Sequence, residues 1–281
     1  MRLFLSLSYA HSPTTPDDEY QLCLLDQLFL PPTCQVVLVA DVTDHHSTLW
    51  TLGLPTPRDS ACLSDIRTVK IAAHPHKPAA DENYATFKIE LVNSARGTIS
   101  FDRISYYAKY PSHFSHQGFL DIFESIETGS VETLCFYRCP THTHHELPQI
   151  SPQHVAQGLR KFTNLKTLVL VDCMITRCLG GLHSCPTIDT LVVYSVDVTP
   201  TSTDVIDRVE EFVVSRKRAG SPLRALTLLL PFAQPCPLEP GRLVDYVGRV
   251  EVLTGRGALF WDLDKYLLSA STREDRNPSR L

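Results

Sequence analysis

The amino-acid sequence predicts an α/β fold in which stacked repeats place parallel strands on one side and helices on the other. Two observations carry this prediction. The apolar spacing L-x-x-L-x-L occurs twice within residues 162–198, once from Leu165 and again from Ile188. Each copy begins near turn-forming residues, runs through alternating apolar residues as a short strand, and leads into a segment that can form helix. Units of this kind bury their apolar side only by stacking on their neighbours.

The same spacing recurs along the chain and is typical of leucine-rich repeats. The strands that carry it begin at Ile66, Val131, Leu165, Ile188, Leu223 and Val247. The distance between copies varies, which predicts an irregular solenoid whose helical sides differ in length. A terminal repeat must shield its open core, so we expect a cap around Trp261 and Tyr266.

Other segments supply further elements. A β-branched run over residues 34–40 predicts a strand, and alternating residues at 87–91 and 99–104 predict a strand pair inserted into the repeat order. Helical spacing predicts helices over residues 17–30, 117–126, 152–162 and 203–219. The last of these ends with Arg216, Lys217 and Arg218, where the helix dipole favours cations.

Composition limits the classes of function. The 281 residues are 43% hydrophobic and 20% charged, with a net charge of -5, so no broad basic surface for nucleic acid is expected. No stretch approaches the ~18 apolar residues of a membrane span, so we expect no membrane partner. We expect an N-terminal extension (1–16), one repeat domain (17–268) and a disordered C-terminal tail (269–281).

The cysteines favour a reducing compartment. There are nine, an odd number, and Cys135, Cys173 and Cys185 fall inside or beside repeat strands, where a thiol fills space as a small apolar group. The apolar run at the N-terminus is broken by Ser6 and Ser8, which argues against a secretory signal. We therefore expect a cytoplasmic or nuclear protein.

One loop offers possible metal chemistry. The string CFYRCPTHTHH contains Cys139 and His142, two residues able to ligate zinc, but no second Cys or His pair follows at finger spacing. No G-x-S-x-G, H-E-x-x-H or P-loop string is present in the sequence. We therefore expect no cofactor and no catalytic residues. A metal-binding or hydrolytic enzyme centred on Cys139 and His142 stays open as the alternative.

The strands also predict a second face. If Leu168 and Leu170 face the core, the residues between them face the other way, and the same holds in the neighbouring strands. The partner-binding residues predicted on this face are Tyr137, Val169, Val171, Val192, Tyr194 and Leu229. An exposed apolar strip usually marks a surface for a partner. A second interpretation stays open, in which another element such as residues 260–268 covers the strip.

The chain resembles the leucine-rich-repeat portions of fungal F-box proteins. The resemblance lies in FTNLKTLVLVDC, HSCPTIDTLVVYS, AGSPLRALTLLL and the ending with Trp261 and Asp262. It implies a non-enzymatic substrate-binding module of a ubiquitin ligase, with a protein ligand of unknown identity. In that family an F-box binds a Skp-type adaptor. No F-box-like stretch precedes residue 17 here, so we expect adaptor binding only if an F-box is supplied elsewhere.

Overall fold

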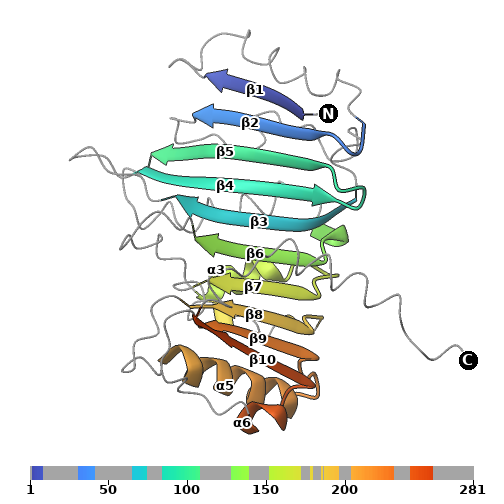
Figure 1. Ribbon diagram of the computed structural model, residues 1–281, viewed down its shortest axis with the longest axis vertical. Coiled ribbons are helices and arrows are strands. Elements are labelled where there is room, and N and C mark those ends of the chain that lie inside the picture. Colours follow the sequence, from blue (N-terminus) through green and yellow to red (C-terminus); the bar gives the residue numbers. More distant parts are fainter. Residues whose placement is uncertain are drawn as a thin grey trace, which may run out of the picture.

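The computed structural model describes residues 2–8, 31–41, 65–74, 84–107, 128–138, 152–171, 178–179, 185, 187–195, 204–230 and 241–255. These residues form an α/β structure with one open, mostly parallel sheet and few helices (Figure 1). The strands are β1 (Arg2–Ser8), β2 (Gln35–Asp41), β3 (Ile66–His74), β4 (Tyr84–Asn93), β5 (Thr98–Tyr107), β6 (Thr133–Arg138), β7 (Thr167–Val171), β8 (Thr190–Tyr194), β9 (Ala225–Leu230) and β10 (Arg249–Thr254). The helices are η1 (Thr128–Ser130), α3 (Pro152–Leu159), α5 (Asp204–Arg218) and α6 (Gly241–Val244).

The ten strands lie in the order β1-β2-β5-β4-β3-β6-β7-β8-β9-β10. All of them run parallel except β4, which is antiparallel to β3 and to β5. The strands predicted from the repeat spacing are confirmed, and so is the inserted strand pair, which is the β4–β5 hairpin. The hairpin lies between β2 and β3, where it separates two strands that are parallel to each other.

The repeat anchors form the core of the C-terminal half of the sheet. Register places Leu134, Leu168, Leu191 and Leu226 side by side in adjacent strands, and each is 0% exposed. Such a row arises because equivalent positions of parallel strands point to the same face of the sheet. Further buried residues come from α3, from the residues after it and from α5, namely Leu159, Phe162, Val209, Phe212 and Val213.

Helix α5 confirms the helix predicted over residues 203–219. It ends before Gly220, whose φ of 77° is a conformation that favours glycine at a helix C-terminus. The predicted basic end of this helix is confirmed, and one of its three cations, Arg216, is buried. Its guanidinium donates hydrogen bonds to the carbonyls of Cys185 (2.8 Å) and Ile188 (2.5 Å), and so ties α5 to the segment before β8.

A polar contact joins the β4–β5 turn to the residues before β2. The buried Asn93 side chain donates to the Pro32 carbonyl (2.8 Å) and accepts from the Gly97 amide (2.7 Å). A Cβ at Gly97 would lie 1.9 Å from the Pro32 oxygen, so only glycine fits there without a shift of the backbone. The β4–β5 turn is therefore tied to the residues before β2 by the Asn93 side chain and by a backbone hydrogen bond from the Thr98 amide to the Cys34 carbonyl.

Several expectations fall outside the described residues. These are the helices at 17–30 and 117–126, the cap around Trp261 and Tyr266, and the tail at 269–281. One element was not predicted. Residues 2–8 form β1, a strand that pairs with β2. Among the described residues, no helix has the length and hydropathy needed to cross a membrane.

Candidate partner-binding face

The face of β6 to β10 opposite the anchors is built from rows of equivalent residues. We call it the candidate face. Parallel register sets three rows across these strands: Thr133, Thr167, Thr190, Ala225 and Arg249; Cys135, Val169, Val192, Thr227 and Glu251; and Val171, Tyr194, Leu229 and Leu253. The predicted partner-binding residues of β7 to β9 are thus brought together as neighbours.

Three of the six residues of the predicted strip are buried, which favours the second interpretation above, in which the strip is covered, over the first, in which it is exposed. Val169, Val192 and Leu229 are at most 2% exposed and form one hydrophobic cluster with Cys135. Tyr194 and Leu253 pack against this cluster and keep partial exposure. For Tyr137 and Val171, the described part of the structure includes the backbone only.

The second row continues into the inserted strands with a change from apolar to polar residues. Lys70 of β3 lies beside Cys135 and is followed across the sheet by Glu90 and Ser100. The Lys70 Nζ lies 2.8 Å from the Glu90 Oε1, with side chains 10% and 24% exposed. A partly buried lysine needs such a partner, because an unpaired buried charge is strongly unfavourable. The face is therefore charged over β3 and β4 and apolar over β6 to β8.

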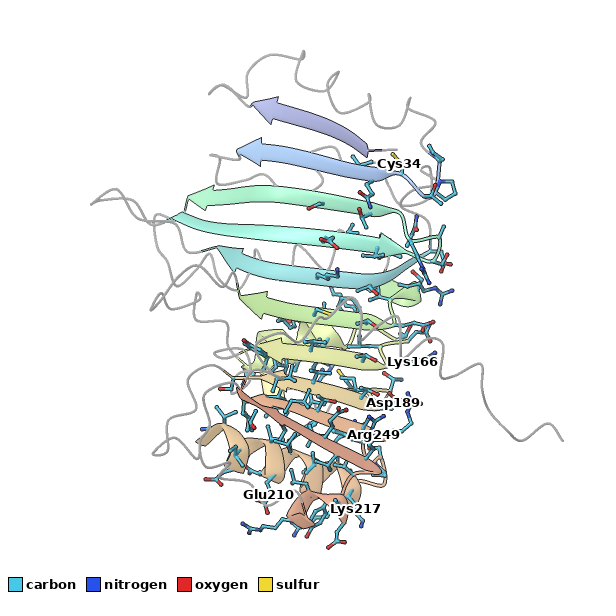
Figure 2. All side chains as sticks on the ribbon, viewed as in Figure 1. Cys34, Lys166, Asp189, Glu210, Lys217 and Arg249 are labelled. Atoms are coloured by element: carbon cyan, nitrogen blue, oxygen red, sulfur yellow. The ribbon has the colours of Figure 1, made fainter. Side chains whose placement is uncertain are left out.

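A line of alternating charges runs along the edge where the strands begin. We call it the charge ladder, and its members each precede equivalent strand positions: Arg67, Glu132, Lys166, Asp189 and Arg224. Three of its ion pairs are Arg67–Glu132 (2.5 Å), Lys166–Glu132 (3.3 Å) and Arg224–Asp189 (3.3 Å). Lys166 and Asp189 are visible at this edge in Figure 2.

The backbone of the charge ladder is also connected from strand to strand. The amides of Glu132, Lys166, Asp189 and Arg224 each donate to the carbonyl of the preceding ladder residue, at 2.7 to 2.9 Å. The series stops at Gly248, whose amide donates instead to the Leu223 carbonyl. Sequence reasoning missed the ladder, although aligning the residues before each strand anchor would have shown the alternating charges.

Neighbouring groups shift the pKa values of Arg67, the first residue of the charge ladder, and of Asp65 beside it. A hydrogen bond from Ser94, together with the nearby Arg67 guanidinium, lowers the pKa of Asp65 despite partial burial. Burial disfavours the charged form of Arg67, but Asp65 and Glu132 outweigh this effect and raise the pKa of Arg67. Both groups are therefore held in their charged forms, which is what an ion-pair ladder requires.

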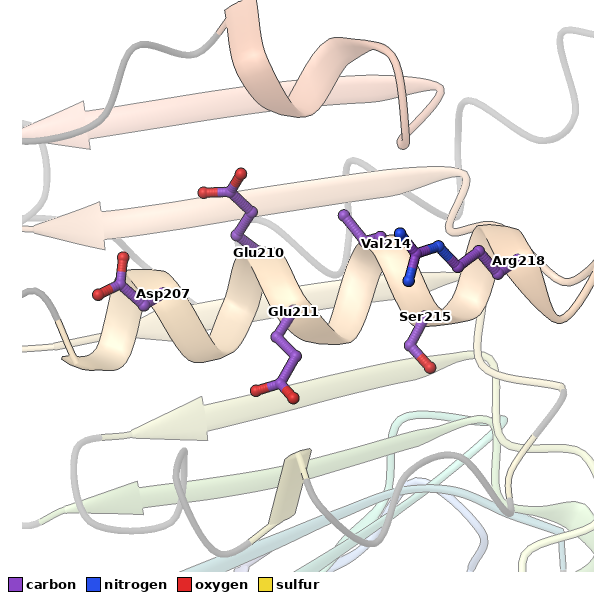
Figure 3. Close-up of a pocket in the computed structure, with 6 residues that line it drawn as sticks. All are labelled: Asp207, Glu210, Glu211, Val214, Ser215 and Arg218. Atoms are coloured by element: carbon purple, nitrogen blue, oxygen red, sulfur yellow. The ribbon is translucent and has the colours of Figure 1, made fainter.

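A pocket of about 530 Å³ lies along the outward side of α5. The described residues that line it are Asp207, Glu210, Glu211, Val214, Ser215 and Arg218 (Figure 3). They follow one another at helical spacing, with carboxylates toward the helix N-terminus and Arg218 at its end, as the helix dipole favours. The described part of the wall is thus one helix surface.

The alternative metal site falls outside the described residues, since both Cys139 and His142 lie in the segment after β6. Within the residues that are described, no group of three potential metal ligands occurs. The described cysteines are Cys34, Cys135, Cys178 and Cys185, all of them are buried, and none of these four forms a disulfide. Burial raises the pKa of Cys185 against the opposing effect of Arg216, so this thiol is held in its neutral form.

Comparisons with other proteins add no relative to this description. No protein-family model matches the chain, and neither a curated protein nor a solved structure matches it significantly. The inferences below therefore rest on the sequence and on the geometry of the described residues.

Proposed function

We propose that this chain is a non-enzymatic protein-recognition module. In this proposal its strands are the repeats of a leucine-rich-repeat-like solenoid, and its role resembles that of the substrate-binding repeats of F-box subunits. The observation that supports it most is the register of β6 to β10, in which equivalent residues of successive strands lie side by side. Stacked units of this kind build extended surfaces that suit large ligands such as proteins.

The proposed contact region is the partly exposed margin of the candidate face. Val169, Val192 and Leu229 form a buried base, and Tyr194 and Leu253 pack on it with part of their surface accessible. Tyrosines set on a rigid apolar base are common binding hot spots, because their large surface is ordered before the partner arrives. Tyr137 and Val171 remain members of the proposed region through their places in the strands.

The test begins with capture of binding proteins by the purified full chain, followed by reconstitution with the purified partner. Binding would then be measured by calorimetry for the parent chain and for Tyr194→Ala, Tyr194→Phe and Glu211→Lys. We expect Tyr194→Ala to weaken binding about thirtyfold, as for a hot spot, and Tyr194→Phe to retain most of the affinity.

Glu211→Lys is the control, because this exposed residue lies on α5 rather than on the candidate face. It should bind as the parent chain does. Equal losses for Tyr194→Ala and Glu211→Lys would place the contact elsewhere. Failure to recover any protein that binds the purified chain directly would argue against the proposed function itself.

A further inference from the structure

The apolar residues of β10, the last strand of the sheet, are less buried than those of the adjacent strand β9. In β9 the residues Leu226, Leu228 and Leu229 are at most 2% exposed, whereas their register partners Val250, Val252 and Leu253 in β10 are only partly buried. The adjacent helix α6 ends with Val244, which is 56% exposed. Apolar surface of this kind at the end of a stacked sheet is a site for a further layer or strand.

The backbone of β10 offers a second reason for association. It is the terminal strand in the sheet order, and among the described residues no strand pairs with its outer side (Figure 1). Such an edge presents backbone donors and acceptors that another strand can satisfy. A second copy of β10 placed about a twofold axis would pair antiparallel and meet the same residues from the other side.

The charges of β10 select one register for that pairing. Arg249 and Glu251 lie on the same face, and directly opposite residues of an antiparallel pair also share a face. Centring the axis on Val250 sets each Arg249 opposite the Glu251 of the second copy, which gives two ion pairs. Centring it on Glu251 instead sets the two carboxylates against each other, and centring it on Val252 sets Glu251 against Leu253.

We propose that two copies of this chain associate through the outer edges of their β10 strands, centred on Val250, to form one continuous sheet. Arg249 and Glu251 are accessible for this contact, with side chains 58% and 37% exposed, and within one copy they lie 3.0 Å apart. Val250 and Val252, which lie on the same face of β10, supply the hydrophobic part of the interface. The oppositely charged pairs fix its register, because the alternatives lack them.

The test measures the oligomeric state of the full chain by sedimentation velocity over a range of concentrations. The parent chain is expected to be a dimer that dissociates on dilution. Arg249→Glu or Glu251→Arg alone should weaken association about tenfold or more, because each places like charges opposite each other twice. The double variant restores both pairs and should restore association.

Glu211→Arg makes the same charge change as Glu251→Arg on α5, and it should leave association unaltered. In Figure 3 the Glu211 side chain points away from the Glu210 side of α5. Circular dichroism verifies that each variant is folded, and hydrogen exchange of the β10 amides in the parent chain should slow as concentration rises. A parent chain that is monomeric at about millimolar concentration, or a double variant that stays dissociated, would overturn the proposal.

Discussion

The row of buried leucines gives a sharp test of how the sheet is stabilised. Leu168→Ala removes three carbon atoms from a side chain that is 0% exposed, a transfer loss of about 2.4 kcal/mol at ~0.8 kcal/mol per methylene. Its neighbours Leu134 and Leu191 are also fully buried, so the site can collapse little and a cavity remains. The expected total loss of unfolding free energy is therefore about 3 to 5 kcal/mol.

Val250→Ala is the matched comparison, because Val250 occupies the same row at the end of the sheet and is only partly buried. It should cost about 1 kcal/mol, since fewer atoms leave a less buried site. Urea unfolding of both variants measures the two losses with a common dependence on denaturant, at a protein concentration low enough to keep the proposed β10 contact dissociated. If Leu168→Ala cost no more than Val250→Ala, the row would not be a continuous packed core.

Three further predictions follow from local geometry. Gly97→Ala should lower the unfolding free energy by about 1 to 3 kcal/mol, because the new Cβ meets the Pro32 carbonyl, whereas Gly129→Ala has open space and should be neutral in the same thermal melts. Folding lowers the pKa of Asp65, so its ionised form stabilises the folded chain. This contribution to the unfolding free energy is complete above the ordinary pKa of 3.8 and is lost as pH falls through the pKa of the folded state. Asp65→Asn, which tolerates the φ of 54° at this position, should therefore flatten the loss of stability in acid, and an unchanged pH profile would contradict this. Cys185 should react with a thiol reagent only after unfolding, because it is buried and burial raises its pKa. Rapid labelling of Cys185 itself in the native chain, located by mass spectrometry of peptides, would refute this.

The strands of this fold are readable from sequence because their spacing repeats. The anchors at Leu168 and Leu191 mark their strands through local pattern alone, and the alternation around Phe87 was enough to predict the inserted pair. The strand at residues 2–8 was not predicted, although Leu3, Leu5 and Leu7 alternate, because a short apolar run after the first residue is equally typical of a leader segment.

The state of the candidate face was not predictable in the same way. Alternation shows that Val169 and Val192 share a face, but a single sequence does not show what lies against that face. The Lys70–Glu90 ion pair depends on the register between β3 and β4, which brings these two residues opposite each other. Side-chain partners of this kind follow from the topology, and local sequence patterns do not report them.

The hairpin between β2 and β3 has a consequence for how a sheet of this type can change in size. Only β4 runs against its neighbours, and β5 is parallel to β2, so the two strands enter together by a short turn while β2 and β3 keep a common direction on either side of them. The sheet can therefore change in size in two ways, by single parallel strands that each need a crossover or by a hairpin whose two strands enter together. The Asn93–Pro32 contact marks the seam at which this pair was accommodated, and excising the whole hairpin would bring β2 and β3 together with compatible directions.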